Sequence, residues 1–326
     1  KNFYIFNNKK GVIMKILVLT SGGDAPGMNM VLYLLQRRFI GRIYACRAGF
    51  KGLVNNDIIT LSAFKPHKHM FEAGSAIKSS RYPQFNTKEG FEKALENARR
   101  FDCLIILGGN GSYKGALQLA ENGIKTVFIP STIDNDVEIS EYSQGFHTAV
   151  SACCDYIDSV MPTMEAFDRC CIFETMGRKC GKIASEVFNI KKSDYLVQEE
   201  TDIDYDKIAE IVRKKNGRGE ASSIILRENI VKIDDFIKNL GEKCPKVEIK
   251  GCVIGYLQRG TKPTKVELDY AKQFAKGAIN AVFSDAGCSA IVYRNKKFEI
   301  IESLKREQPS KKKILIPKRK KEKKNN

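Results

Sequence analysis

The chain has 326 residues, of which 43% are hydrophobic and 29% are charged, and its formal net charge is +17. This composition is typical of folded globular proteins and excludes fibrous and disordered classes, and the length predicts two domains of roughly 100–200 residues with a cleft between them. No apolar run reaches the ~18 residues that span a bilayer, and residues 1–13 lack the apolar centre of a signal peptide. We therefore expect no membrane association and interpret residues 1–13 as an N-terminal extension.

The positive charge is concentrated in part at the end of the chain. Residues 309–326 are dense in lysine and arginine and are predicted to be a basic, disordered tail. No module typical of nucleic-acid binding accompanies the charge, so we predict no nucleic-acid partner and expect the scattered lysines to attract phosphorylated ligands. Nucleic-acid binding stays an alternative, and it would show itself by a steep dependence on salt.

The cysteines and histidines are not expected to form a metal site. The ten cysteines lie in apolar context or as adjacent pairs, such as Cys153-Cys154, and no C-x-x-C pair occurs. Such cysteines are typical of reduced thiols, which predicts a cytoplasmic protein. The three histidines make no ligand cluster with the cysteines, so a zinc site is not expected.

Strands and helices alternate from residue 14 onward, which predicts an α/β fold with mostly parallel sheets that carry helices on both faces. In the first half of the chain we expect strands at 14–19, 103–107 and 125–129, and helices at 28–37, 91–100 and 116–122. In the second half we expect strands at 170–174, 223–226 and 251–257, and helices at 149–160, 183–188 and 266–283.

Three polar loops follow predicted strands. They are SGGDAPGMN at 21–29, GGNGSY at 108–113 and STIDND at 131–136. Open α/β sheets bind ligands at the carboxyl ends of their strands, so one cleft should collect all three loops. The glycines allow a phosphate to approach backbone amides at the start of a helix. The first loop matches neither G-x-x-x-x-G-K-[ST] nor G-x-G-x-x-G, so the sequence supports neither a Walker site nor a dinucleotide fingerprint. A tight turn without a ligand stays an alternative for this loop.

The third loop carries two carboxylates, Asp134 and Asp136, at a spacing of two residues. If the backbone there is extended, both side chains point to the same side. Phosphoryl transfer to an alcohol needs a group that accepts the hydroxyl proton and a cation that neutralises the phosphoryl oxygens. Asp134 and Asp136 are candidates for the base and for a Mg²⁺ ligand. An Asx-rich turn that only caps backbone groups is the alternative.

These three loops, in this order, resemble the phosphofructokinase family. The resemblance continues through SRYP at 80–83, ETMGRKCG at 174–181 and GYLQRG at 255–260, and it covers about residues 14–283. It implies a phosphofructokinase-like α/β fold of two three-layer α/β/α domains with mostly parallel sheets. Residues 14–145 plus 258–308 would bind nucleotide, residues 146–257 would bind sugar phosphate, and the chain would form a homotetramer.

The resemblance also implies an activity, the transfer of the γ-phosphoryl group of MgATP to the 1-hydroxyl of fructose 6-phosphate. Asp134 would be the base, aided by Thr132 and Arg178, and Mg²⁺ would be held by Asn110 and Asp136. The residues implied for ATP are Gly22, Arg81, Tyr82, Gly109, Asn110, Gly111 and Ser112. Those implied for fructose 6-phosphate are Thr132, Asp134, Arg169, Met176, Gly177, Arg178, Glu228, Lys250, Tyr256 and Arg259.

The chain departs from the family pattern at several of these positions. Asn110 stands where the family usually has an aspartate that engages Mg²⁺, Tyr256 replaces a histidine, and Lys250 replaces an arginine. Ser131 stands where ATP users have glycine and pyrophosphate users have lysine, whereas Gly111 argues for ATP. Two alternatives therefore stay open. The chain could be a pyrophosphate-dependent or other sugar-phosphate kinase, or a catalytically weakened paralogue that acts as a ligand-binding regulatory subunit.

Overall fold

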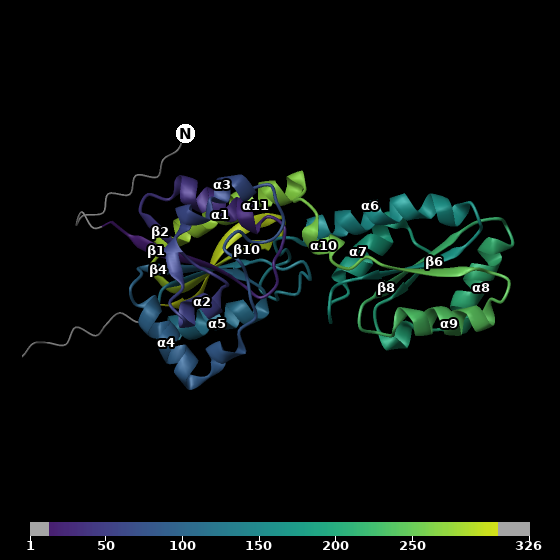
Figure 1. Cartoon of the computed structure of the whole chain (residues 1–326), viewed down its shortest axis with the longest axis horizontal. Coiled ribbons are helices and arrows are strands. Elements are labelled where there is room, and N and C mark those ends of the chain that lie inside the picture. The colour runs from purple at the N-terminus through teal and green to yellow at the C-terminus, as the bar shows by residue number, and fades with distance from the viewer. Residues whose placement is uncertain (1–12, 306–326) are drawn as a thin grey trace, which may run out of the picture.

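Two β-sheets organise the chain, and the chain crosses between them twice (Figure 1). The computed structural model describes residues 13–305. The predicted basic tail, and all but the last residue of the predicted N-terminal extension, lie outside the described residues.

The first sheet has seven strands in the order β11-β10-β5-β4-β1-β2-β3. Its central pairs are parallel, whereas the edge pairs β2–β3 and β10–β11 are antiparallel. The strand bounds are β1 Lys15–Ser21, β2 Arg42–Cys46, β3 Ile58–Thr60, β4 Cys103–Gly108, β5 Thr126–Pro130, β10 Ala286–Arg294 and β11 Lys297–Lys305.

Helices cover both faces of this sheet because its central strands are apolar on both sides. In β1, Ile16 and Val18 pack into one apolar cluster, and Leu17 and Leu19 pack into the other, all fully buried. Such continuous apolar runs are typical of parallel strands buried on both faces. The first face is covered by α1 Met28–Arg38 and α11 Lys265–Val282, and α3 Pro66–His69 packs against α1. The second face is covered by α2 Phe50–Val54, α4 Lys88–Ala98 and α5 Asn110–Glu121. Two 3₁₀ turns, Leu61–Phe64 and Pro83–Asn86, complete this part.

The second sheet has four parallel strands in the order β7-β8-β6-β9. Its strands are β6 Cys170–Thr175, β7 Tyr195–Val197, β8 Ser222–Arg227 and β9 Ile249–Val253. Helices α6 Phe146–Glu165 and α7 Lys182–Lys191 pack on one face, α8 Tyr205–Asn216 and α9 Ile233–Lys243 pack on the other, and a 3₁₀ turn spans Glu200–Asp202. The predicted α/β class with mostly parallel sheets is confirmed.

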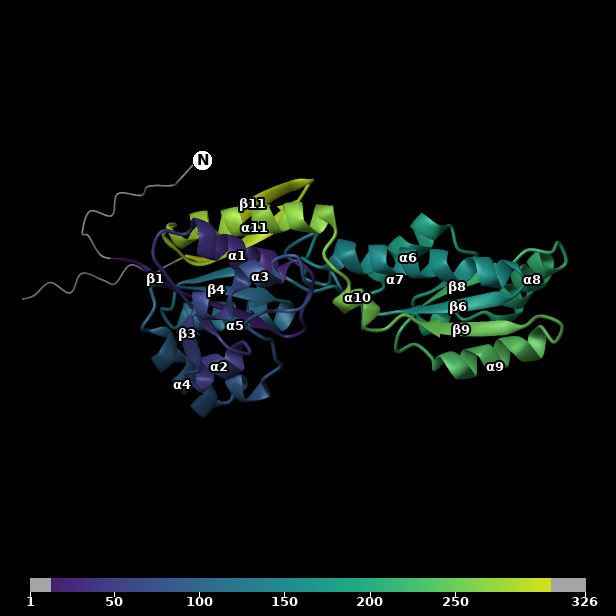
Figure 2. The same cartoon turned by 45° about the horizontal axis from the view of Figure 1, so that its top comes forward.

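The two crossings place the candidate site. The first runs from β5 into α6, and the second runs from β9 through α10, Leu257–Gly260, into α11. Both views show α10 between the two sheets (Figures 1 and 2). The loops that leave the carboxyl ends of β5 and β6 therefore meet near these crossings.

Among the predicted elements whose bounds differ from the structure, two affect the candidate site. The helix expected at 116–122 begins at Asn110, because the Gly109 carbonyl already accepts hydrogen bonds from the amides of Ser112 and Tyr113. Packing of its apolar face on the sheet outweighs the low helix propensity of the glycines that we had assigned to a turn. The strand expected at 251–257 ends at Val253, because Gly255 has a φ of 55° and a helix follows.

Candidate active site

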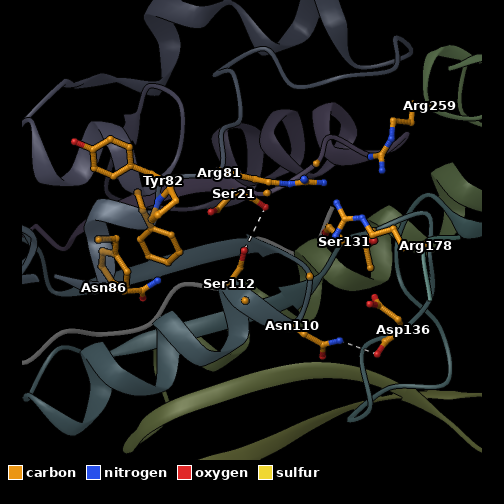
Figure 3. A pocket seen from close by; sticks show the side chains of 18 residues that line it. Ser21, Arg81, Tyr82, Asn86, Asn110, Ser112, Ser131, Asp136, Arg178 and Arg259 are labelled. Atoms are coloured by element: carbon orange, nitrogen blue, oxygen red, sulfur yellow. Dashed lines mark hydrogen bonds between the residues drawn. The ribbon is translucent and has the colours of Figure 1, made fainter. Parts of the chain in front are cut away.

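A cleft of about 350 Å³ opens where the loops after β1, β4 and β5 meet (Figure 3). The structure therefore brings together the three polar loops found in the sequence. The cleft is lined by Ser21, Gly22, Gly23, Phe50, Arg81, Tyr82, Pro83, Phe85, Asn86, Gly109, Asn110, Gly111, Ser112, Ser131, Thr132, Asp136, Arg178 and Arg259. Of the residues predicted for ATP, all lie in this lining.

Hydrogen bonds hold the first two loops and the Arg81 segment together. The Gly22 amide donates to the Ser80 carbonyl at 3.0 Å, and the Ser112 hydroxyl donates to the Ser21 carbonyl at 3.2 Å. A Cβ at Gly23 would lie 2.5 Å from the guanidinium of Arg259, so any larger residue there would displace this side chain. This close approach lets Arg259 reach the Asp24 carbonyl at 2.8 Å and enter the cleft.

The start of α5 is suited to an anion. Gly109 precedes the helix without a side-chain cap, and the first turn carries no acidic residue. The first amides of a helix have no partner inside the helix, and the helix dipole places partial positive charge there. Asn110 and Gly111 thus present amides to the cleft, at a position suited to a phosphate group.

Asp134 is a buried carboxyl group, 2% exposed. Its Oδ1 has no hydrogen-bond partner, and its Oδ2 lies 3.5 Å from Nε of Arg178. The pKa of Asp134 is raised to about 6, mainly by burial and also by the nearby Asp136 and Glu228, although the Arg259 guanidinium and the hydrogen bond with Thr132 oppose this rise. Asp134 is therefore largely ionised at neutral pH and close to the point at which it accepts a proton.

The backbone of this loop is not extended. Asn135 has a φ of 50°, in the left-handed region. Asp134 points inward, whereas Asp136 lines the cleft, so the two side chains do not share a side as the extended form would require. The buried Asn135 side chain fixes the turn, because it accepts from the Ser143 amide at 2.7 Å and donates to the Glu141 carbonyl at 3.0 Å.

The turn that carries Arg178 comes from the second sheet. Gly177 has a φ of 139°, and a Cβ there would lie 2.3 Å from the Cys180 carbonyl. One oxygen of Glu228 accepts from the amides of Gly177 and Arg178 at 3.0 and 2.8 Å. Glu228, predicted as a sugar ligand, thus uses this oxygen to hold the turn in place, so that the half-exposed Arg178 faces Asp134.

Sequence reasoning did not identify three residues that support these loops. The buried Gln258 accepts from the Met176 amide at 3.1 Å, and Lys182 donates to the Asn135 carbonyl at 2.8 Å across the two sheets. Asn135, described above, is the third. Gln258 lies inside the GYLQRG segment and Asn135 lies between the two aspartates, so their places within these motifs could have identified them. Nothing in the sequence points to Lys182.

Three other predicted sugar-phosphate ligands do not line this cleft. Arg169 precedes β6, whose six residues separate it from the Met176 turn by about 20 Å at about 3.3 Å per residue. Arg169 stacks over Phe167 at 4.1 Å and pairs with Glu248, which also binds Lys250 at 2.7 Å. Tyr256 is 81% exposed at the start of α10. The structure brings none of Arg169, Lys250 and Tyr256 into the lining of the cleft.

The fold and these loops match known proteins. The family model described as phosphofructokinase matches residues 15–282. The chain belongs to the phosphofructokinase family. The ATP-dependent 6-phosphofructokinase of Paenibacillus macquariensis is 34% identical over 284 residues, which cover 85% of this chain and 88% of that protein. The resemblance stated from the sequence is thereby confirmed.

Solved phosphofructokinases share the fold. The crystal structure of Pichia pastoris phosphofructokinase in the T-state aligns with a TM-score of 0.82 at 24% identity, over 92% of this chain and 38% of that chain. The pyrophosphate-dependent phosphofructokinase of Marinobacter aquaeolei aligns with a TM-score of 0.74 at 18% identity, over 89% of this chain and 81% of that chain. The second of these proteins is named as pyrophosphate-dependent, so the fold alone does not identify the donor of this chain.

The residues near the phosphofructokinase cleft fit a Mg²⁺ ion only sparsely. Among residues 13–305, no group of three or more histidine, cysteine or acidic side chains could hold a metal ion. Asn110 donates its side-chain amide to the Asp136 carbonyl at 2.8 Å, which leaves the oxygen of its side chain available, and the Asp136 carboxylate lines the cleft (Figure 3). Mg²⁺ commonly uses one or two carboxylates together with substrate phosphates and waters, so these two residues fit it if a phosphorylated ligand completes the set.

Asn110→Asp is expected to lower the Mg²⁺ concentration for half-maximal activity by about tenfold, because affinity for hard cations rises with ligand charge. The same change removes the bond to the Asp136 carbonyl, which contributes about 1 kcal/mol, so the metal-free protein should melt slightly lower. Calorimetric Mg²⁺ titration with a non-hydrolysable ATP analogue measures the affinity. Asn122→Asp, at the far end of α5, is the control. An equal Mg²⁺ affinity in wild type and Asn110→Asp would contradict the assignment.

The helices of the described residues differ from membrane-spanning helices. Within residues 13–305, none is both long enough and apolar enough to cross a bilayer.

Proposed function

We propose that the chain is an ATP-dependent 6-phosphofructokinase, which converts fructose 6-phosphate to fructose 1,6-bisphosphate. The observation that carries this proposal is the position of Asp134. Its buried carboxylate lies beside Arg178 and in the same loop as Asp136, which shares a cleft with the phosphate-suited start of α5. The relatives named ATP-dependent 6-phosphofructokinase support the same activity.

ATP occupies the part of the cleft formed by the first sheet. Its phosphates lie at the amides of residues 109–112 and near Gly22 and Arg81. Its base lies against Tyr82 and against the stacked rings of Phe50 and Phe85, whose centroids are 4.1 Å apart. Fructose 6-phosphate occupies the side formed by the Met176–Arg178 turn and Glu228. In this arrangement residues 14–145 plus 258–308 bind nucleotide, and residues 146–257 bind the sugar phosphate.

Asp134 takes the proton of the sugar 1-hydroxyl while that oxygen forms its bond to the γ-phosphorus and the bond to the leaving ADP oxygen breaks. A base works best when its pKa is near the working pH, and burial brings the pKa of Asp134 to about 6. Arg178 turns from Asp134 toward the transferring group, which opens the carboxylate to the hydroxyl. Arg178 and Arg259 then stabilise the charge on the phosphoryl oxygens, and Thr132 orients the loop. Mg²⁺, held by Asp136 and Asn110, supplies neutralisation of phosphate charge when bound.

Arg169 and Lys250 act on sugar phosphate only in an assembly. Both lie near the end of the second sheet that is remote from Asp134, where Glu248 pairs with each of them. A second copy could place this basic pair beside a neighbouring cleft, in a homotetramer. Sedimentation of the purified protein tests this, and a monomer that turns over at the full rate would contradict it. All ten cysteines are free thiols, which supports a cytoplasmic location.

The phosphoryl donor is ATP because of two positions. A Cβ at Gly111 would meet nothing within 4 Å, so the cleft has room for a nucleotide there. Ser131 is neutral and fully buried, so the chain lacks the lysine that the resemblance implies for pyrophosphate users, although it also lacks the glycine of ATP users. In an assay with fructose 6-phosphate and Mg²⁺, we expect kcat/KM with ATP to exceed kcat/KM with pyrophosphate by at least about 10³. Pyrophosphate has no adenosine, so it leaves the contacts of the adenosine site unused.

The same assay separates the alternatives. Faster turnover with pyrophosphate would make the chain a pyrophosphate-dependent kinase. If neither donor supports turnover while calorimetry detects ATP or fructose 6-phosphate binding, the chain is a weakened paralogue with a regulatory role. If other sugar phosphates are phosphorylated faster than fructose 6-phosphate, the acceptor is wrong and the donor assignment still holds.

A further inference from the structure

The first turns of α6 and α11 are joined by a buried network centred on Glu267. Glu267 is fully buried in the first turn of α11. Its Oε2 accepts from the Tyr142 hydroxyl at 2.9 Å, from the Thr148 hydroxyl at 3.2 Å and from the Thr148 amide at 3.4 Å. Helix α6 has no side-chain cap from Gly145, which precedes it, so Glu267 supplies its cap from another helix.

The network also runs in the opposite direction. The Thr148 hydroxyl accepts from the Thr264 amide at 3.2 Å, just before α11 begins. Thr264 caps α11 by accepting from the Glu267 amide at 3.2 Å, and its hydroxyl lies 3.0 Å from Nδ1 of His147. Each helix thus provides a side chain that accepts a hydrogen bond from a backbone amide at or just before the start of the other helix. These starts are the two points at which the chain leaves and re-enters the part built on the first sheet (Figure 2).

The network is continuous with the loop that bears Asp134. Gln144, two residues before α6, donates its amide to the Pro130 carbonyl at 2.9 Å, and its side chain accepts from the Ser131 hydroxyl at 3.4 Å. The side chains of Gln144 and Glu267 both lie against Gly27, where a Cβ would be 2.7 and 3.1 Å from them. A shift of Glu267 therefore disturbs both the α6 start and the segment that supports the catalytic loop.

We propose that Glu267 is a positioning residue that sets the orientation of the second sheet relative to Asp134, by locking the starts of α6 and α11 together. This inference rests on the proposed function. In the proposed arrangement, ATP contacts mainly the loops of the first sheet, which form most of the cleft lining, whereas fructose 6-phosphate bridges Asp134 and the Arg178 turn, which lie 3.5 Å apart. Loss of the lock therefore weakens sugar-phosphate binding and spares ATP binding.

The chemistry of the site indicates which variants are informative. Burial raises the pKa of Glu267 to about 7, and its remaining oxygen, Oε1, has no hydrogen-bond partner. A glutamine keeps the shape and a neutral acceptor for Tyr142 and Thr148, so Glu267→Gln should retain the lock. Glu267→Ala removes it. Thr148→Val keeps the size of Thr148 and removes the hydroxyl that bonds both Glu267 and Thr264.

The test compares KM for fructose 6-phosphate with KM for ATP in these purified variants. We expect Glu267→Ala and Thr148→Val to raise KM for fructose 6-phosphate about tenfold, as the loss of a hydrogen bond to a charged group does, with KM for ATP changed less than about twofold. Glu267→Gln should restore KM for fructose 6-phosphate to within about threefold of wild type. Phe274→Leu, a core change in the same helix outside the network, should lower Tm and leave both KM values unchanged.

Several results would overturn the proposal. A parallel rise in both KM values, or an unchanged KM for fructose 6-phosphate in Thr148→Val, would show that the network only stabilises the fold. If Glu267→Ala does not fold, Thr148→Val and Glu267→Gln decide the question. The wild type is assayed first, so absence of turnover there contradicts the proposed function and is distinct from failure of the variants to show the split.

Discussion

Asp134→Asn is expected to lower kcat by about 10²–10⁴, the range that general-base catalysis typically contributes. The amide keeps the size of the carboxylate but cannot take the hydroxyl proton. ATP binding should be unchanged, because Asp134 lies beneath the wall of the cleft and does not line it. Steady-state kinetics gives kcat, and calorimetry with an ATP analogue gives the affinity.

The control for this variant is Asp102→Asn. Asp102 accepts from the Lys15 amide at 2.7 Å, at the amino end of β1 and remote from the cleft, and an asparagine can accept the same bond. This variant should keep the wild-type kcat. If Asp134→Asn also kept it, the assignment of the base would be wrong.

The pH dependence of kcat/KM in the wild type is a second test of Asp134 as the catalytic base. Catalysis needs the carboxylate form, and burial raises its pKa to about 6. Because one proton blocks the base, kcat/KM should be constant above that pKa and fall about tenfold for each pH unit below it. Arg259 lowers this pKa, so Arg259→Gln should move the acid limb to higher pH. A wild-type profile that is flat down to pH about 4, near the ordinary aspartate pKa, would contradict this.

Arg178→Ala is expected to lower kcat/KM for fructose 6-phosphate by about 10²–10³, because one cation that stabilises transferring charge is lost. Arg178→Lys should recover only part of this, since an ammonium cannot reproduce the planar fork of a guanidinium. Arg178 Nε lies 3.5 Å from Asp134, so its loss also leaves that buried carboxylate without its nearest cation. The kinetics are measured with each substrate varied in turn.

Lys179→Ala controls for the charge and for the turn. Lys179 is the next residue, is exposed and carries the same charge, but it does not line the cleft. We expect it to keep at least about half of the wild-type kcat/KM, as surface substitutions usually have small effects. An equal loss in Lys179→Ala and Arg178→Ala would mean that the effect comes from net charge near the cleft and not from the position of the guanidinium.

Much of the site was predictable because its residues are local in sequence. Buried strands such as β4 are continuous apolar runs, and a polar loop must follow where each run ends. Parallel strands bring such loops to one edge of the sheet, which placed Gly22, Asn110 and Thr132 near one another without knowledge of the strand order. The family resemblance then supplied roles that the loops alone left open.

The remaining features depend on contacts that sequence spacing does not encode. Asn135 adopts a left-handed conformation because Ser143 and Glu141 hold its side chain, so the extended backbone that would place Asp134 and Asp136 on the same side is not formed. The pairing of α6 with α11 joins residues more than a hundred positions apart, as in the bond between Thr148 and Glu267. The remote position of Arg169 follows from which end of β6 faces the cleft, and this depends on the direction in which the chain crosses between the sheets.

The most direct test of the account is the formation of fructose 1,6-bisphosphate from fructose 6-phosphate and ATP at saturating Mg²⁺, measured side by side for the wild type and Asp134→Ala. We predict that the wild type turns over at about 1–100 s⁻¹, as kinases typically do, and that Asp134→Ala is slower by at least about 10². Absence of product from the wild type, or equal rates in the two proteins, would contradict the account.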